Sequence, residues 1–170
     1  DGDIRTRELL IENDSPKFSN IPQFDYSAIK ETLNADQLKA VDAVSKINDY
    51  CLILGMPGTG KTTVISSLID CIVKSGYSVL ISAYTHSAVD NICEKLIKNS
   101  RNRGEPLNML RTGVLSKIRP LVQQFCIYSE NYRHEIKNSD EFQKTIDQCP
   151  IVATTCLGIS DIVFGMGKKF

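Results

Sequence analysis

The stretch Gly55-Met56-Pro57-Gly58-Thr59-Gly60-Lys61-Thr62 matches the pattern G-x-x-x-x-G-K-[ST], in which a glycine-rich loop joins a strand to a helix. The apolar run at residues 50–54 before it indicates a buried parallel strand. After it, apolar residues recur at helical spacing as far as Lys74, and Gly76 supplies a stop signal. Strand, loop and helix in this order direct backbone N–H groups and a helix N-terminus at one point, which predicts an anion site.

The residue types in the loop suit a polyphosphate. Glycines let the backbone approach the ligand because no Cβ intervenes. The Lys61 ammonium can reach the β- and γ-phosphates, the Thr62 hydroxyl is placed to ligate Mg²⁺, and Thr63 lies near the α-phosphate. The alternative is an ordinary glycine-rich turn, but the flanking pattern favours nucleotide binding. The predicted nucleotide-binding residues here are Gly55, Met56, Pro57, Gly58, Thr59, Gly60, Lys61, Thr62 and Thr63, with Lys61 and Thr62 also predicted to act in catalysis.

Composition is that of a globular protein of one domain by length, with 42% hydrophobic and 24% charged residues among 170. Because the formal net charge is zero, the overall charge of the chain does not indicate binding to nucleic acid or membrane. No apolar run approaches membrane-spanning length, and the charged N-terminus lacks a signal-peptide core. None of the six cysteines forms a C-x-x-C pair, so we interpret them as small buried hydrophobic residues in a reducing compartment and assign them no metal.

The remaining pattern alternates helices and strands. Residues 1–32 form a lead-in with little regular structure, and a helix follows from Asn34, its expected N-cap. Strands are expected at 50–54, 78–83, 107–110 and 151–155, with a helix from Asn138 to about Gln148 before the last. This alternation predicts an α/β fold with a parallel sheet flanked by helices, as in the first half of a phosphate-loop ATPase.

Two further features suit a polyanion. The junction at residues 84–91 is rich in hydroxyls and amides and leads into a helix, where such groups can hold a backbone phosphate. His86 within it has no visible partner, so we interpret it as structural or as a strand contact. Residues 95–119 are locally basic, which fits either a solvated face or phosphate neutralisation.

Taken together, the motifs resemble those of a superfamily 1B helicase, the group that includes the nonsense-mediated-decay helicases. The resemblance spans residues 33–158, and its Met-Pro pair, THSAVDN and VATTCLG are similar to the eukaryotic helicase/nuclease branch that acts in DNA replication. The motifs that carry the resemblance are Gln37, GMPGTGKTT at 55–63, SAYTHSAVDN at 82–91, Arg111-Thr112-Gly113 and VATTCLG at 152–158.

The resemblance implies the first RecA-like domain of an ATP-dependent 5′-to-3′ DNA helicase/nuclease that processes Okazaki-fragment flaps and resects broken DNA ends. It implies ATP and Mg²⁺ as cofactors, with Gln37 contacting adenine. The implied partners are single-stranded DNA, a second RecA-like domain and a nuclease domain with an iron–sulfur cluster, without a membrane, in the nucleus and with the mitochondrion as a further candidate. The residues implied to contact the single strand are Thr85, His86, Ser87, Arg111, Thr112, Thr154 and Thr155.

One departure from the family is the Walker B strand ending in Asp-Glu. The only Asp-Glu pair, Asp140-Glu141, follows Asn138-Ser139 rather than an apolar run. We therefore expect a lead-in at 1–32 and a partial RecA-like domain at 33–170, truncated before the Walker B strand, which binds nucleotide weakly and hydrolyses it negligibly. Two alternatives stay open: the RNA- or DNA-directed nonsense-mediated-decay and senataxin branch, and a non-hydrolysing nucleotide-binding module.

Overall fold

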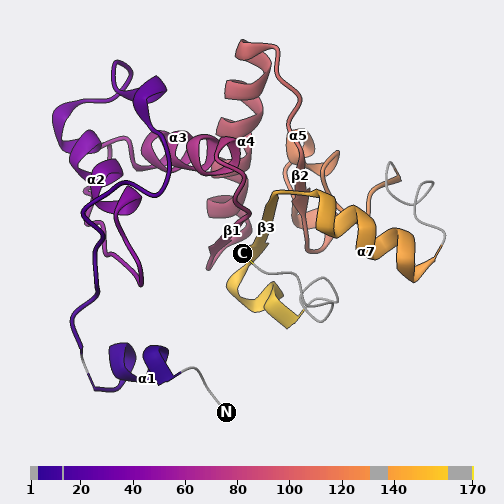
Figure 1. Ribbon diagram of the computed structural model, residues 1–170. Helices are drawn as coiled ribbons and strands as arrows, with labels where there is room; N and C mark the ends of the chain where they lie inside the picture. The colour runs from indigo at the N-terminus through magenta and orange to yellow at the C-terminus, as the bar shows by residue number, and fades with distance from the viewer. Residues whose placement is uncertain (1–3, 13, 131–137, 161–169) are drawn as a thin grey trace. The chain divides into compact units, whose positions relative to one another are not determined.

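The computed structural model describes residues 4–12, 14–130, 138–160 and 170, drawn in colour in Figure 1. The chain divides into two compact units, Asp1–Val64 and Ile65–Phe170. The first unit holds α1 (Ile4–Leu10), η1 (Ser27–Ile29), α2 (Ala35–Ser45) and the start of α3 (Lys61–Lys74). The second holds the rest of α3 and then β1 (Val79–Ala83), α4 (His86–Arg103), β2 (Met109–Arg111), η2 (Leu115–Lys117), α5 (Pro120–Gln123), α7 (Ser139–Gln148), β3 (Ile151–Thr155) and η3 (Cys156–Ser160).

Helix α2 begins as the sequence predicts. The Asn34 side chain accepts a hydrogen bond from the Gln37 backbone N–H at 2.9 Å, and the Gln37 side-chain oxygen accepts one from the Asn34 N–H at 3.1 Å. This reciprocal capping box satisfies two N–H groups that the first helical turn leaves without partners. The prediction of Asn34 as the N-cap is confirmed. The same capping box also holds the Gln37 side-chain oxygen in place.

The lead-in segment packs along the end of α2. Ser19 and Gln23 donate backbone hydrogen bonds to the carbonyls of Lys46 and Ser45, at 2.5 and 2.6 Å. A single antiparallel bridge joins Phe18 to Ile47. Residues 17–23 therefore bond to the end of α2 without forming a strand, and α1 and η1 are the only regular elements among the described residues before α2.

An ion pair fastens α1 to the turn after α2. Arg5 lies 2.8 Å from Asp49 and also contacts Glu8 and Asp14. The Arg5 hydrogen bond, followed by one from the Lys17 backbone N–H, lowers the pKa of Asp49 to about 2. The Arg5 and Asp49 side chains are 24% and 10% exposed, so solvent screens this pair only in part.

The strand predicted at residues 50–54 is wrong. These residues form no strand, and Leu52 and Leu54 are 90% and 95% exposed. A parallel strand needs a neighbour to satisfy its backbone groups, and no strand among the described residues pairs with this run. An apolar run that pairs with no strand cannot bury both of its faces. The apolar pattern alone therefore predicted a strand that does not form.

The second unit contains the predicted parallel sheet, with three strands in the order β1-β3-β2. Val79 pairs with Ile151 on one side of β3, and Met109 pairs with Ile151 on the other. Strand β2 begins two residues later than the sequence predicted. Pro150 immediately precedes β3 and has no N–H, so the three-stranded ladder starts only at Ile151.

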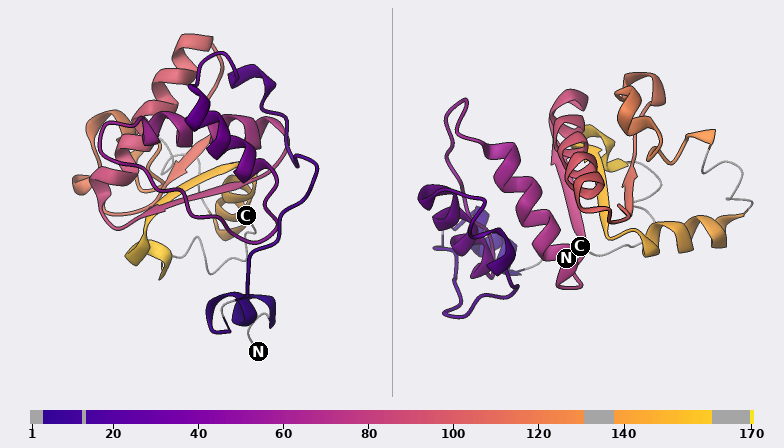
Figure 2. Two further views of the ribbon diagram at one scale, coloured as in Figure 1. Left: turned by 90° about the vertical axis from the view of Figure 1, so that its left-hand side faces the viewer. Right: turned by 90° about the horizontal axis from the view of Figure 1, so that it is seen from above.

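Helices cover both faces of this sheet. On one face, Ile151 and Ala153 pack with α4 residues such as Leu96 and Cys93. On the other, Val152 packs with Ile146 of α7. Figure 2 shows α4 and α7 on opposite sides of the strands. Alternate residues of one strand thus enter two different cores, which confirms the α/β architecture of a sheet flanked by helices.

The other helix predictions also hold at their ends. Helix α3 runs from Lys61 to Lys74 and Gly76 follows it with φ 88°, as expected of a helix stop. Helix α7 has Asn138 as N-cap, accepting from the Glu141 N–H at 2.9 Å. Within the described ranges, no helix is both long and apolar enough to cross a membrane.

Candidate functional site

The glycine loop of the first unit folds around the Lys61 side chain. The Lys61 ammonium donates hydrogen bonds to the carbonyls of Gly55 at 2.6 Å and Met56 at 2.7 Å. A Cβ at position 55 would come within 2.7 Å of the Lys61 methylenes. The loop therefore needs glycine there to hold the lysine stem, and the exposed ammonium stays inside the loop.

Two other glycines of the loop adopt backbone conformations that side chains rarely take. Gly58 and Gly60 have φ of 81° and 82°. A Cβ on Gly60 would lie 2.7 Å from the Gln37 side-chain nitrogen, whereas one on Gly58 would meet no atom within 4 Å. Gly60 is thus restricted by backbone and by contact, and Gly58 by backbone alone.

Gln37 is joined directly to the loop. Its amide nitrogen donates to the Thr59 carbonyl at 3.0 Å, while its amide oxygen belongs to the α2 capping box. The structure therefore brings Gln37 and the glycine loop together, 22 residues apart in sequence. The amide is engaged at both ends by the protein's own backbone.

The residues present fit a nucleotide polyphosphate. The Gly58 position is open, and α3 begins at Lys61, so a helix N-terminus follows the loop without a break. Lys61 is bonded to neutral carbonyls, which an anionic phosphate oxygen can replace with a stronger, charge-assisted partner. The residues present are therefore compatible with the phosphate site that the sequence predicts.

A second group of predicted residues lies at one edge of the sheet in the other unit. Because β1, β2 and β3 are parallel, their carboxyl ends meet at the same edge. The segments that leave this edge contain all seven residues predicted to contact nucleic acid, namely Thr85, His86 and Ser87 after β1, Arg111 and Thr112 at the end of β2, and Thr154 and Thr155 at the end of β3.

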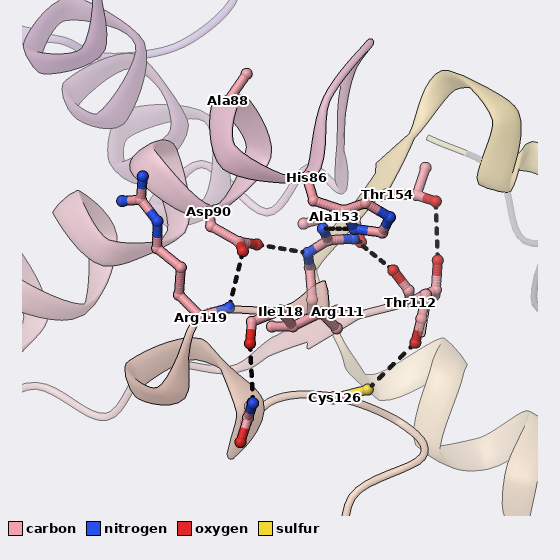
Figure 3. A network of polar contacts seen from close by, with 12 residues as sticks. His86, Ala88, Asp90, Arg111, Thr112, Ile118, Arg119, Cys126, Ala153 and Thr154 are labelled. Atoms are coloured by element: carbon pink, nitrogen blue, oxygen red, sulfur yellow. Dashed lines mark hydrogen bonds and ion pairs between the residues drawn. The ribbon is translucent and has the colours of Figure 1, made fainter. Parts of the chain in front are cut away.

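Arg111 is the centre of a buried network at this edge (Figure 3). Its side chain is completely buried, and Nε donates to Asp90 Oδ1 at 3.0 Å. Its Nη1 donates to the carbonyls of both Thr112 and Ala153. Arg111 shares the α4-facing side of β2 with Met109, which explains why a charged residue of a buried strand meets α4.

His86 is held in one protonation state by this arginine. Arg111 Nη2 lies 3.1 Å from His86 Nδ1. A guanidinium only donates, so Nδ1 accepts and the ring proton is on Nε2. Burial, and then the Arg111 charge, lower the pKa of His86 below its ordinary value, and Asp90 opposes this only in part. His86 is therefore a neutral ring with an N–H donor away from the arginine.

Three close approaches bring the segments at the strand ends together. The Thr112 hydroxyl donates to that of Thr154 at 2.9 Å, and both side chains are completely buried. A methyl group on Gly158 would collide with the Thr154 hydroxyl, so the turn after β3 passes directly over it. Gly113 has φ 129° and a Cβ there would come within 3.2 Å of the His86 ring.

The seven predicted contact residues differ in exposure. Thr85 and Ser87 are exposed and Thr155 is half-buried, so these three can reach a ligand at the sheet edge. Thr85 is also the N-cap of α4, accepting from the Ala88 N–H at 3.2 Å. The side chains of Arg111, Thr112 and Thr154 are buried and bonded inside the protein.

Sequence reasoning did not single out Asp90 or Arg119. Asp90 is completely buried and accepts from both Arg111 and the Arg119 backbone N–H, the latter at 3.0 Å. The Arg119 side chain pairs at 3.2 Å with Glu94, which lies on α4 together with Asp90. The available signal for Asp90 was its position among the apolar residues of α4, four residues after His86. An acidic residue is buried in such a place only when it is paired, so the sequence could have predicted a basic partner.

The cysteines are all free thiols. Four of them, Cys71, Cys93, Cys126 and Cys149, are buried, as predicted for small hydrophobic residues. Cys51 is half-buried and Cys156 is exposed, so the interpretation fails for the latter. Cys156 lies at the sheet edge, where the Ser82 hydroxyl is 3.5 Å from its sulfur.

Comparison with known proteins agrees with these features. The chain is 43% identical over 167 residues to the DNA replication ATP-dependent helicase/nuclease DNA2 of Saccharomyces cerevisiae, covering 96% of this chain and 10% of that protein. It is 38% identical to the human protein of the same name, covering 94% and 15%, and 32% identical to the helicase/nuclease JHS1 of Arabidopsis thaliana, covering 91% and 11%.

The chain thus spans about a tenth to a seventh of the length of these relatives. The similarity confirms the resemblance to a superfamily 1B helicase of the helicase/nuclease branch. The model of the AAA domain family matches residues 32–149, which include the glycine loop, His86, Asp90 and Arg111. Since this match covers more than half of the chain, the protein belongs to the AAA domain family.

Proposed function

We propose that this chain is the ATP-binding part of an ATP-dependent DNA helicase/nuclease that moves 5′ to 3′ along DNA. The observation that carries the proposal is the position of the Lys61 ammonium, 2.6 and 2.7 Å from two loop carbonyls at the N-terminus of α3. The printed names of the relatives, all ATP-dependent helicase/nucleases of DNA replication, support it.

In this proposal the loop backbone from Gly58 to Thr63 cradles the phosphates of ATP. Lys61 exchanges its carbonyl partners for phosphate oxygens, and the Thr62 hydroxyl ligates Mg²⁺. The metal, when bound, neutralises charge on the phosphates during phosphoryl transfer. Gln37 contacts adenine, which requires its amide nitrogen to leave the Thr59 carbonyl.

We further propose that the sheet edge contacts single-stranded DNA. Thr85, Ser87 and Thr155 offer hydroxyls to backbone phosphates, and His86 offers its Nε2–H. Arg111, Thr112 and Thr154 contribute by positioning these neighbours, because their side chains are already bonded and the backbone N–H groups of Arg111 and Thr112 donate to the Phe125 and Ala153 carbonyls. Hydroxyls and N–H groups position a strand without reading its sequence, as a translocating enzyme requires.

The wider role is proposed from the relatives. Their printed names support a role in DNA replication. From the motif resemblance we propose action on Okazaki-fragment flaps and at broken DNA ends, in the nucleus and with the mitochondrion as a further site. A second RecA-like domain supplies the arginine finger, and a nuclease domain carries the iron–sulfur cluster. An arginine finger contributes about 10³ to 10⁵ in rate where it has been measured. The isolated chain is therefore expected to bind nucleotide weakly and to hydrolyse it negligibly.

The test is nucleotide binding by the purified chain, measured by calorimetry with and without Mg²⁺. Lys61→Ala is expected to abolish binding. Lys39→Ala, which removes an exposed ammonium paired with Asp36, is expected to leave it unchanged. Equal binding by the Lys61 variant and the parent chain would overturn the proposed site.

A second measurement separates DNA from RNA. The chain is titrated with single strands of the same sequence in the two chemistries, because 2′-hydroxyl contacts are what distinguish them. Tighter binding to DNA supports the helicase/nuclease assignment, and tighter binding to RNA supports the RNA-directed branch. ATP turnover by the isolated chain comparable to that of a complete helicase would contradict its expected inactivity.

A further inference from the structure

Helix α4 presents a row of cations on the side away from the sheet. Lys95, Lys98 and Arg101 follow one another at three-residue intervals, which places them along one side of the helix. Lys98 and Arg101 are exposed and Lys95 is half-buried. The opposite side of α4 is buried against the sheet through residues that include Val89, Cys93, Leu96 and Ile97.

The charges of this cationic row are not neutralised within the part of the chain that the structure describes. The neighbouring arginines have acidic partners: Arg103 pairs with Asp70 and Glu105, and Arg119 pairs with Glu94. No such pair engages Lys95, Lys98 or Arg101 among the described residues. The acids closest in sequence to the row, Glu94 and Glu105, are both occupied elsewhere.

The chemistry of this face fits phosphates rather than bases. Helix α4 contains no Phe, Tyr or Trp, and the row's polar neighbours on this side are Ser87, Asn91, Glu94 and Asn102, of which the acidic Glu94 is paired with Arg119. Proteins that hold single strands usually stack bases on aromatic rings, which this face cannot do. A double helix instead presents regular phosphates and hides its bases, with one charge per about 1.7 Å of axis.

The spacing suits the same partner. Three residues of α-helix rise about 4.5 Å, so the cationic row covers about 9 Å of the α4 axis. Over that length a duplex carries about five phosphates. The row runs away from the N-terminus of α4, where Thr85 and Ser87 lie at the edge proposed for the single strand.

We infer that the cationic row of α4 binds the phosphate backbone of a duplex arm adjoining the single strand on which the enzyme acts. The inference rests on the proposed action on DNA, but it concerns a different surface from the sheet edge. Contact through phosphates alone is independent of base sequence and sensitive to salt.

The experiment measures the affinity of the whole chain for three labelled DNAs by fluorescence anisotropy: a single strand, a blunt duplex, and a fork that joins the two. Each is titrated from 50 to 200 mM salt. The test variant is Lys95→Gln/Lys98→Gln/Arg101→Gln, in which glutamine keeps the helix propensity. The matched control is Arg7→Gln/Lys39→Gln/Lys144→Gln, which removes the same charge at other exposed positions.

For duplex and fork, the test variant is expected to lower the slope of log affinity against log salt by about 2.7. Between 50 and 200 mM salt, the factor by which the affinity of the test variant falls is therefore about 40 times smaller than the factor for the parent chain. Single-strand affinity is expected to stay unchanged, and so is every slope in the control variant. Circular dichroism of each variant verifies the fold.

Three results would overturn the inference: equal effects of the test and control variants, an equal loss on single strand and duplex, or no binding of duplex by the parent chain at 50 mM salt. The single-strand arm tests the proposed function separately. Duplex binding that depends on the row, without any single-strand binding, would retain the inference and reject the proposed role of the sheet edge.

Discussion

Arg111 Nε and Asp90 Oδ1 lie 3.0 Å apart, and both side chains are completely buried. The pair joins the end of β2 to the first turns of α4, and the same guanidinium reaches the His86 ring at the start of that helix. One buried ion pair therefore fixes the orientation of the helix start relative to the strand ends. The proposed single-strand edge depends on this arrangement.

Removing one partner of the pair is expected to be strongly destabilising. Asp90→Ala leaves the Arg111 charge buried without its carboxylate, and such changes lower the free energy of unfolding by about 3–5 kcal/mol. Urea denaturation followed by circular dichroism measures the loss. Asp36→Ala, which breaks an exposed pair with Lys39, is the control and is expected to change stability little. If Asp90→Ala lowered the free energy of unfolding as little as Asp36→Ala, the buried pair would be dispensable.

Substitutions in the glycine loop are expected to differ by position. Gly58→Ala and Gly60→Ala both force a side chain into a positive φ, at a cost of about 1–2 kcal/mol. Only the second also brings a methyl group within 2.7 Å of Gln37. Gly60→Ala is therefore expected to lower the melting temperature and the nucleotide affinity more than Gly58→Ala does.

A double-mutant cycle assigns this difference to the contact. Combining Gly60→Ala with Gln37→Ala removes the clash, so the combined loss is expected to be smaller than the sum of the two single losses. The Gln37→Ala variant alone accounts for the loss of the capping box. Strictly additive losses would mean that the Gln37 side chain moves aside freely.

Stability is expected to decline as the pH falls below about 6.5. The pKa of His86 is lowered in the folded chain, so above the unfolded value near 6.5 neither state binds the proton. As the pH falls through that value, the unfolded state binds the proton first, and the free energy of unfolding decreases until the folded pKa is reached. The loss lies on the acid side of 6.5.

The measurement is urea denaturation at several pH values between 7.5 and 5 in a His134→Gln background, where His86 is the only histidine. Adding His86→Gln is expected to flatten the profile in this range. A slope that persists without His86 would assign the pH dependence to other groups. The Asp49 carboxylate does not interfere, because its pKa of about 2 lies well below the range.

The thiols of the exposed Cys156 and the buried Cys93 are expected to react at very different rates. Burial raises the pKa of Cys93 to about 12, so at pH 8 it carries almost no thiolate, while Cys156 is exposed. Timed alkylation followed by mass spectrometry should label Cys156 rapidly and Cys93 only after denaturation. A Cys156→Ser variant identifies the fast phase. Rapid labelling of Cys93 in the native chain would contradict its place in the core.

Much of this protein follows from local sequence. The start of α3 at Lys61, the caps at Asn34 and Asn138 and the stop at Gly76 rest on interactions within a few residues, and each is found as predicted. The alternation of apolar runs also predicts the parallel sheet and its flanking helices, because burial on both faces demands it. Local chemistry was sufficient wherever the partner group is nearby in the chain.

Tertiary structure decided the rest. The run at 50–54 is as apolar as a buried strand, but a strand also requires a paired neighbour, and pairing is not encoded in the run itself. Likewise, the arginines of the basic stretch look alike in sequence, yet Arg111 is buried against Asp90 while Arg101 is exposed on the outer side of α4. Only the parallel register of β2 with β3 and the packing of α4 on this sheet separate the two roles, because a charge acts through the groups that surround it in space.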